Sequence, residues 1–364
     1  MNKVIITGAG AIGLMSARQL AMAGYPVTVV ERGEPGRESS WAGGGIVSPL
    51  YPWRYPDAVN QLADYSQQRY PALAMMLKET TGIDPELLES GMLLLDDPEP
   101  EIDAWSERWN HPVEYLDGAA AIAAVQPGLN SDYSRATWLP DLMQLRNPRL
   151  LAALLADVGQ RPQITLTAHA QVQSIALDNG RAVGVETDKG RIEGDIVLIC
   201  AGAWSSGLLP ESALSARRVE PVKGQMIQFQ TAPGMLARMV MRDSRYLIPR
   251  KDGLILAGST LEHTGFEKQT DQQALEQLRD FAIDVVPALR DAPIVNHWAG
   301  LRPGTDTGIP LIGPHPEIDN LFINAGHFRN GIVIGLASVR LGIDLILGNP
   351  PIFDPEPYQI AGNH

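Results

Sequence analysis

The 364-residue sequence is poor in cysteine, in lysine and in long uninterrupted hydrophobic runs. Its one cysteine, Cys200, excludes an intramolecular disulfide and any metal or iron–sulfur site that needs several cysteines. A lone cysteine is typical of proteins from a reducing compartment, so we expect a cytoplasmic protein. The seven histidines show no metal-ligand spacing, and neither a Gly-x-Ser-x-Gly turn nor a Walker loop occurs. The sequence therefore predicts no metal site.

No apolar stretch reaches the roughly 20 residues that are needed to span a bilayer. The apolar segment 331–348 is interrupted by Arg340 and Asp344, so it predicts a core helix instead. Residues 1–24 end in small residues as a signal peptide does, but Arg18 and three glycines interrupt them. We therefore expect neither a membrane anchor nor a cleaved signal.

The charge is acidic overall, with a formal net charge of −13, and lysine is scarce among the cations. Phosphate binding needs a basic face, so this balance argues against a nucleic-acid binder or an anionic-membrane binder. Only six of the 29 Lys and Arg residues are lysines. Because guanidinium groups bind planar carboxylates and phosphates well, some of the arginines are candidates for recognising small anions.

Hydrophobic patterning predicts a βαβ unit at the start of the chain, with a strand over 3–7, a helix over 11–24 and a strand over 27–30. A glycine-rich loop over 39–49 follows. Further helices are expected over 57–80 and 271–286, and further strands over 164–199, 196–200, 226–229, 246–248, 254–257 and 321–324. Elements of dinucleotide-binding type recur at the start, middle and end of the chain, which predicts two domains assembled from discontinuous segments.

The strongest local signal is Gly8-Ala9-Gly10-Ala11-Ile12-Gly13, which follows a strand and opens a helix. Gly8 makes the tight turn, Gly10 lets a pyrophosphate approach, and Gly13 packs the helix on the strand. The phosphate would then accept from free N–H groups at the helix N-terminus. Glu31 ends the next strand, where its carboxylate would accept from a ribose hydroxyl and repel a 2′-phosphate. This disfavours NADP and leaves NAD and FAD open.

Four later segments favour FAD over NAD, because they resemble segments of a known family. Through these segments the sequence resembles the D-amino-acid oxidase superfamily of FAD enzymes, and within it the glycine oxidases of the thiamine pathway. The matching segments are Ser39-Ser40-Trp41-Ala42-Gly43-Gly44-Gly45-Ile46, Ile199-Cys200-Ala201-Gly202-Ala203-Trp204-Ser205, Trp298-Ala299-Gly300-Leu301-Arg302-Pro303-Gly304-Thr305 and Ala325-Gly326-His327-Phe328-Arg329-Asn330-Gly331-Ile332. They occur in family order over nearly the whole chain.

The resemblance implies an α/β fold with a Rossmann-type FAD-binding domain and a second, mixed antiparallel-sheet substrate domain. We expect the FAD-binding domain to comprise 1–50, 146–219 and 303–364. The substrate domain would comprise 51–145 and 220–302.

The resemblance also implies a bound FAD. Some relatives tether the flavin through a cysteine near the last helix, where this sequence has none, so we expect noncovalent binding. The segment 327–333 would present the N-terminus of that helix to the flavin and favour its negative charge on reduction. His327 would act through its backbone more than through its imidazole. The residues expected to bind FAD are Gly8, Gly10, Ala11, Ile12, Gly13, Glu31, Arg32, Ser39, Ser40, Gly44, Gly45, Ile46, Val172, Gly202, His327, Phe328, Arg329, Asn330, Gly331, Ile332 and Val333.

Catalytic and substrate-binding roles are implied for Arg302 and Tyr246. Arg302 would clamp the substrate carboxylate with its guanidinium, and Tyr246 would share that carboxylate through its phenol. Arg329 and Leu261 are expected to complete the substrate site. Ser244 and Leu261 would both face the small substrate pocket. Some relatives carry His and Met at these two positions, which leaves the pocket preference open.

The implied activity is oxidative deamination of glycine, and of small amines such as sarcosine or D-alanine, by hydride transfer to flavin N5. Oxygen would be the acceptor, and the products would be the imine of glyoxylate or glyoxylate, ammonia and hydrogen peroxide. The imine would serve thiazole formation in thiamine biosynthesis. A sarcosine or general D-amino-acid oxidase, a quinone-linked dehydrogenase and a noncatalytic flavin-binding redox sensor stay open. The resemblance further implies a homo-oligomer, a tetramer in related enzymes.

Overall fold

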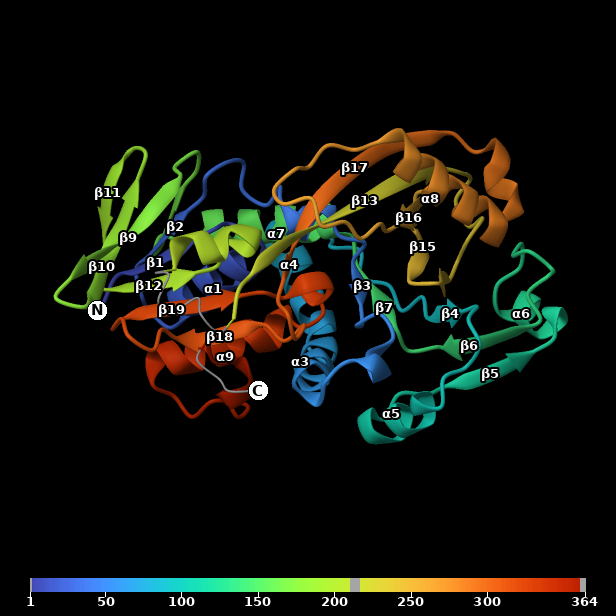
Figure 1. Cartoon of the computed structure of the whole chain (residues 1–364), viewed down its shortest axis with the longest axis horizontal. Coiled ribbons are helices and arrows are strands. Elements are labelled where there is room, and N and C mark those ends of the chain that lie inside the picture. Colours follow the sequence, from blue (N-terminus) through green and yellow to red (C-terminus); the bar gives the residue numbers. More distant parts are fainter. Residues whose placement is uncertain (1, 210–216, 361–364) are drawn as a thin grey trace.

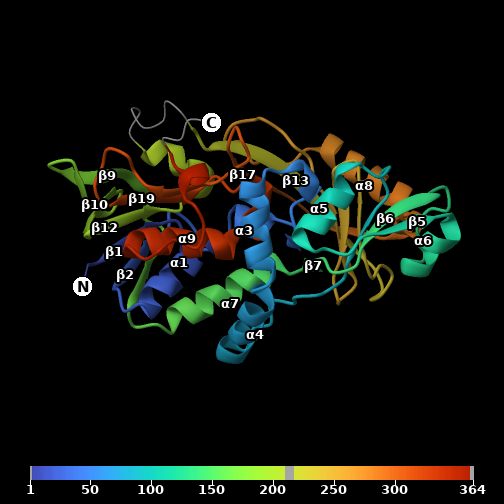
Figure 2. The ribbon, with the colours of Figure 1, turned by 90° about the horizontal axis from the view of Figure 1, so that it is seen from below.

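The computed structural model describes residues 2–209 and 217–360, and two large sheets organise them (Figure 1). A six-stranded sheet forms the left half of the view and an eight-stranded sheet forms the right half. Helices α3 (Asp57–Gln67), α4 (Tyr70–Thr81) and α7 (Asn147–Gly159) lie between the halves, as the second view also shows (Figure 2). A small sheet of β3 (Ile46–Val47) and β7 (Met143–Gln144) links the same region.

The six-stranded sheet has the dinucleotide-binding arrangement. Its order is β18 (Leu311–Pro314), β19 (Leu321–Ala325), β12 (Ile196–Ile199), β1 (Val4–Thr7), β2 (Val27–Val30) and β8 (Ile164–Thr167), and only the β18–β19 pair is antiparallel. Every residue of β1, β2 and β12 is buried, which explains their uninterrupted apolar runs. The expected βαβ unit is therefore confirmed.

Both faces of this sheet are covered. Helices α1 (Ala11–Met22), α7 and α9 (Gly335–Leu347) pack with one face into the largest core. The antiparallel sheet of β9 (Val172–Asp178), β10 (Arg181–Thr187) and β11 (Gly190–Glu193) supplies the second core. No helix within the described ranges combines the length and the apolar character that crossing a membrane requires.

The eight-stranded sheet is mixed, as expected for the second domain. Its order is β17 (Ile294–Gly304), β13 (Glu220–Gln230), β16 (Leu254–Gly258), β15 (Arg245–Pro249), β14 (Met239–Arg242), β4 (Met92–Leu94), β6 (Arg135–Leu139) and β5 (Glu114–Asp117), and only β14 and β4 run parallel. Helices α6 (Ala119–Val125) and α8 (Gln272–Val285) cover one face. The other face carries Met226, Tyr246 and Ile248, with α5 (Glu101–Trp109) packed against its far part.

Three local expectations are wrong. The single helix over 57–80 is two helices, α3 and α4, because the chain turns at Gln68 and Arg69 and Pro71 starts a new first turn. The loop over 39–49 contains α2 (Ser39–Ala42) and β3. The last helix starts at Gly335 rather than Gly331, because a 3₁₀ turn over Phe328–Asn330 precedes it.

The predicted domain boundaries stay a prediction, and residues 1, 210–216 and 361–364 of those ranges lie outside the described part of the chain. Within the range 51–145, α3 and α4 pack against α9 and α7 in the core of the six-stranded sheet. These two helices therefore support the dinucleotide-binding half, although the sequence ranges assign them to the substrate half.

Truncation of Leu62 tests how firmly α3 is packed. Leu62 is fully buried in the core that α3 shares with α9, so Leu62→Ala leaves a cavity there. We expect it to lower the free energy of unfolding by about 2–5 kcal/mol, measured in urea with saturating FAD. Met75→Ala is the control, since Met75 on α4 is 61% exposed and its loss should have little effect. Equal effects of the two variants would contradict this packing.

Candidate active site

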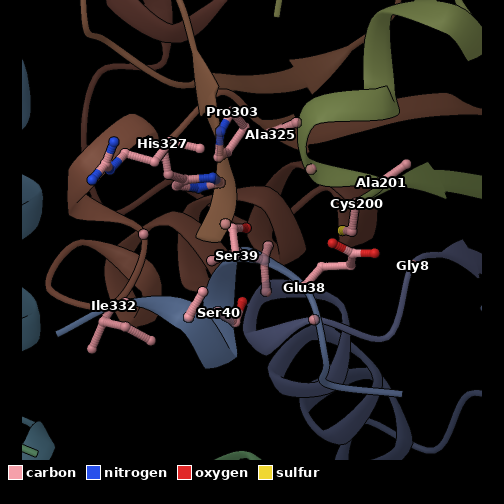
Figure 3. Close-up of a pocket in the computed structure, with 18 of the residues that line it drawn as sticks. Gly8, Glu38, Ser39, Ser40, Cys200, Ala201, Pro303, Ala325, His327 and Ile332 are labelled. Carbon is pink, nitrogen blue, oxygen red and sulfur yellow. The ribbon is translucent and has the colours of Figure 1, made fainter. Parts of the chain in front are cut away.

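One deep cavity lies where the two sheets meet, with about 1710 Å³ of empty space including its open mouth. The carboxyl ends of β1, β2, β12 and β19 form one side of it, which is where open α/β sheets bind ligands. The other side includes Tyr246 and Arg302 of the eight-stranded sheet. Figure 3 shows residues that follow β1 and β12 and residues of β19 and β17 around a single space, with Gly8, Cys200, Ala325 and Pro303 labelled.

The glycine-rich turn after β1 is shaped for a dinucleotide. Gly8 has φ +98°, and a Cβ on Gly13 would lie 2.0 Å from the carbonyl oxygen of Gly8. Ala11 N–H donates to Ser40 Oγ over 3.1 Å, whereas the N–H groups of Gly10 and Ile12 have no acceptor among the described residues. These free donors at the start of α1 fit a pyrophosphate.

Glu31 is held rigidly at the wall of the cavity. Its Oε2 accepts from Ala9 N–H over 2.8 Å and its Oε1 accepts from Gly33 N–H over 3.0 Å. Each oxygen keeps a further lone pair for a ribose hydroxyl. The next residue, Arg32, is exposed and pairs with Glu38 over 2.7 Å.

The turn before α9 provides a second group of free donors. Gly326 and Phe328 have φ of +82° and +48°, which reverses the chain tightly after β19. The N–H groups of Gly331, Ile332 and Val333 then find no acceptor among the described residues. Because Gly331 and Ile332 line the cavity, these donors fit the oxygen or ring nitrogen of a flavin.

The imidazole of His327 is unsuited to act as a base. It is buried, and its Nε2 lies 2.7 Å from Ser338 Oγ. Burial lowers the pKa of His327 to about 3, so the ring is neutral at physiological pH. The His327 side chain therefore contributes by holding the turn before α9 in its shape, through its contact with Ser338.

Three hydrogen-bond acceptors on neighbouring segments of the same chain fix Arg302 on β17. Its Nη1 donates to the carbonyl oxygens of Lys223 and Thr260 over 3.3 and 3.2 Å, and its Nη2 donates to Ser259 Oγ over 2.7 Å. A Cβ on Gly224 of the adjacent strand would lie 2.0 Å from Nη2. Position 224 therefore has to be glycine for the guanidinium to lie where it does.

The electrostatics around Arg302 favour an anion. Burial lowers the pKa of Arg302, the nearby Tyr246 opposes this effect, and the positive charge of Arg329 adds to it. Neither arginine forms an ion pair with a carboxylate of the described residues, and Arg329 Nε is buried without a hydrogen-bond acceptor. A carboxylate that enters this end of the cavity would relieve the repulsion between the two guanidiniums.

Most of the predicted site residues meet in the cavity. Those that line it are Gly8, Gly10, Ile12, Glu31, Arg32, Ser39, Ser40, Gly44, Gly45, Ile46, Val172, Gly202, Tyr246, Arg302, His327, Phe328, Arg329, Gly331 and Ile332. Ala11, Gly13, Asn330 and Val333 belong to the same turns without lining it.

The structure does not bring Leu261 or Ser244 into the cavity, so the expectation that both face the substrate pocket is corrected. Leu261 is 48% exposed because it begins the loop that leaves β16. Ser244 lies in the turn between β14 and β15, where its N–H donates to Tyr51 Oη over 3.0 Å. Neither side chain sets the size of the pocket in this structure.

Sequence reasoning missed several residues that shape the site, among them Gly224 and Ser259, and it quoted Trp204 in a matching segment without giving it a role. Gly224 lies inside β13, and a glycine in a strand interior often marks a close approach of another group. That signal was available, but it did not reveal which group approaches. Ser259 carries no local pattern that separates it from an ordinary serine.

The fold and the cavity together define a class of protein, a two-sheet flavin-dependent oxidoreductase with a cationic substrate end. A family model described as "FAD dependent oxidoreductase" (DAO) matches residues 3–345. The chain belongs to this family, which confirms the resemblance and the FAD cofactor. It is an FAD-dependent amino-acid oxidase.

The chain is similar to several known proteins over its full length. It is 50% identical over 362 residues to the glycine oxidase of Pseudomonas aeruginosa, with 99% of each chain covered. The crystal structure of glycine oxidase from Geobacillus kaustophilus superposes with a TM-score of 0.92 at 29% identity, covering 100% of both chains. The "Bifunctional protein ThiO/ThiG" of Synechocystis is 32% identical over 353 residues, which are 95% of this chain and 52% of that protein.

Acid precipitation of the yellow protein tests how FAD is held. Cys200 lines the cavity, but burial raises the pKa of its thiol, so the nucleophilic thiolate does not form readily. We therefore expect all flavin to remain in the supernatant after precipitation, with Cys200→Ser behaving in the same way. Flavin that stays with the pellet of the wild-type protein alone would contradict noncovalent binding.

Proposed function

We propose that this chain is a glycine oxidase that uses bound FAD and oxygen to deaminate glycine oxidatively. The products are the imine of glyoxylate, which water converts to glyoxylate and ammonia, and hydrogen peroxide. The observation that carries the proposal is the pair Arg302 and Arg329. Both line the cavity that holds the flavin-type turns, and both lack a carboxylate partner among the described residues.

Arg302 binds the substrate carboxylate, and Tyr246 contributes a phenol O–H. Tyr246 Oη donates its hydrogen to Met226 Sδ over 3.9 Å, while its oxygen interacts as an acceptor with the guanidinium of Arg302. Thioether sulfur is a weak acceptor, so the O–H is free to donate to a carboxylate instead. Two such contacts fix the plane of the acid and the direction of the substrate Cα–H bond.

The close packing around Tyr246 supports a small substrate. A Cβ on Gly44 would lie 2.6 Å from Ile248 Cδ1 and 3.2 Å from the Tyr246 ring. A Cβ on Gly258 would lie 3.1 Å from the same ring. The backbones of Gly44 and Gly258 therefore lie directly against the Tyr246 ring. Backbone atoms move less easily than side chains, so the ring has little room to move aside for a bulky substrate.

FAD, when bound, supplies the acceptor for the hydride that leaves the substrate Cα, and oxygen returns it to the oxidised form. The chain contributes orientation through Arg302 and Tyr246. The free N–H groups of Gly331, Ile332 and Val333 stabilise negative charge at the opposite wall. No side-chain base is required: glycine binds with its amine neutral, and the neutral His327 is already bonded to Ser338.

The metabolic role of the proposed reaction is in thiamine biosynthesis, where the imine feeds thiazole formation. The similarity to ThiO/ThiG proteins supports this role, because half of such a protein aligns with nearly all of this chain. A cytoplasmic location and a homotetrameric state are further parts of the proposal. The single cysteine supports the first and the resemblance supports the second.

Removal of the Arg302 side chain tests the carboxylate clamp. We expect Arg302→Ala to raise the KM for glycine by about 100-fold or more, because truncating a buried ionic partner costs two or more powers of ten in binding. The flavin content should stay at the wild-type level, since the dinucleotide contacts are elsewhere. Arg135→Ala is the control, because Arg135 lies exposed on β6. Normal glycine kinetics in Arg302→Ala would refute the assignment.

A substrate panel tests the size of the pocket and the electron acceptor. We expect peroxide formation with glycine, sarcosine and D-alanine, slower or absent turnover of D-proline, and at least ~100-fold lower kcat/KM for D-phenylalanine, since overpacking a rigid site costs several kcal/mol. Peroxide-coupled assays with oxygen consumption provide the measurement. Fast oxidation of D-phenylalanine would indicate a general D-amino-acid oxidase. Turnover that needs an added quinone would indicate a dehydrogenase.

A further inference from the structure

The loop over 261–271 connects the substrate sheet with the FAD-binding half. It leaves β16 and returns as α8, and both of its ends are fixed to Lys223 of β13. The backbones of Lys223 and Glu262 exchange two hydrogen bonds of 2.9 Å. Lys223 Nζ pairs with the Glu262 carboxylate over 2.8 Å and donates to Gln269 O over 3.2 Å. Residues 263–268 between these anchors are exposed.

The tip of this loop makes two side-chain contacts with the other half of the molecule. The ring of Phe266 stacks on Trp204 with a centroid distance of 5.5 Å and an interplanar angle of 26°. Lys268 Nζ lies 2.7 Å from the Glu38 carboxylate. Arg32 joins the two contacts, because its guanidinium carbon lies 3.3 Å from the centroid of a Trp204 ring and it pairs with Glu38.

These contacts lie at the dinucleotide end of the cavity. Arg32, Glu38 and Trp204 all line it, and Arg32 directly follows Glu31, which is placed for a ribose. Glu38 precedes Ser39 and Ser40 beside the same space (Figure 3). Phe266 is 54% exposed, so burial in a core does not explain its position. Its contact with Trp204 ties the loop to the cavity wall.

We propose that the loop is a clasp for the cofactor, in which Phe266 on Trp204 and Lys268 on Glu38 close the adenosine end of the cavity and slow the release of FAD. The inference rests on the proposed placement of the adenosine end near Glu31 and Arg32. Phe266 and Lys268 are positioning residues, since they act on the cofactor through Trp204, Arg32 and Glu38. The aromatic stack contributes more than the ion pair, because exposed ion pairs are screened by solvent.

Release of FAD from the holoenzyme after dilution tests the clasp, followed by the rise in flavin fluorescence. We expect Phe266→Ala to release FAD about five-fold faster, while Phe266→Tyr, which keeps the ring, releases it at the wild-type rate. Lys268→Ala should accelerate release about two-fold at low salt and not at high salt. Tyr115→Ala is the control, because Tyr115 is a similarly exposed aromatic residue, on β5.

A double variant separates the clasp from a general loss of stability. In a Trp204→Ala background the stacking partner is gone, so Phe266→Ala should no longer change the release rate. A wild-type release rate in Phe266→Ala, or an equal acceleration with and without Trp204, would overturn the proposal. The readout is flavin release, so it is independent of glycine turnover. A chain that retains FAD through the clasp and fails to oxidise glycine would refute the proposed function alone.

Discussion

The active site depends on one constraint, the desolvation of the partly buried Arg302 charge without a carboxylate partner among the described residues. A buried guanidinium is stable only if its donors are satisfied and a counter-charge is available. Some of the Arg302 N–H groups donate to the carbonyl oxygens of Lys223 and Thr260 and to the hydroxyl of Ser259, and these bonds fix the direction of the guanidinium. Gly224 provides the space, since any Cβ there would overlap the guanidinium. The charge that remains is complemented by a substrate carboxylate.

The cavity between the two sheets has three regions that differ in their hydrogen-bonding groups and in their charge. At its dinucleotide end, Glu31 accepts hydrogen bonds and the free N–H groups of Gly10 and Ile12 donate them. At the flavin turn, the N–H groups of 331–333 favour negative charge. At the substrate end, two guanidiniums attract an acid. Each end is therefore matched to a different part of a cofactor–substrate pair. Thr260, which directly precedes the loop over 261–271, contacts Arg302 at the substrate end, and Phe266 of the loop contacts Trp204 at the dinucleotide end.

The sequence predicts well those features that depend on local pattern. The buried runs of β1 and β2 and the glycine spacing before α1 predict the βαβ unit, because strand, turn and helix follow one another directly. The resemblance predicts the cofactor and places Arg302, Tyr246 and the turn at 327–333 in one region, and the structure gathers them around one cavity.

The remaining features depend on contacts between distant segments. Periodicity continues across the break between α3 and α4, so an apolar pattern over 57–80 does not reveal the turn at Gln68. Leu261 has a sequence position close to the site, but the loop turns its side chain to solvent. Gly224 becomes informative only when β13 is paired with β17, since the group that needs the space is on that neighbouring strand.

The most direct test of a substrate end and a flavin end within one cavity is anaerobic mixing of the yellow holoenzyme with glycine. If Arg302 holds the glycine carboxylate beside the cofactor, saturating glycine should bleach the flavin absorption completely. Admission of oxygen should then restore it, with hydrogen peroxide formed. A flavin that stays oxidised in saturating glycine, while FAD remains bound, would contradict this arrangement.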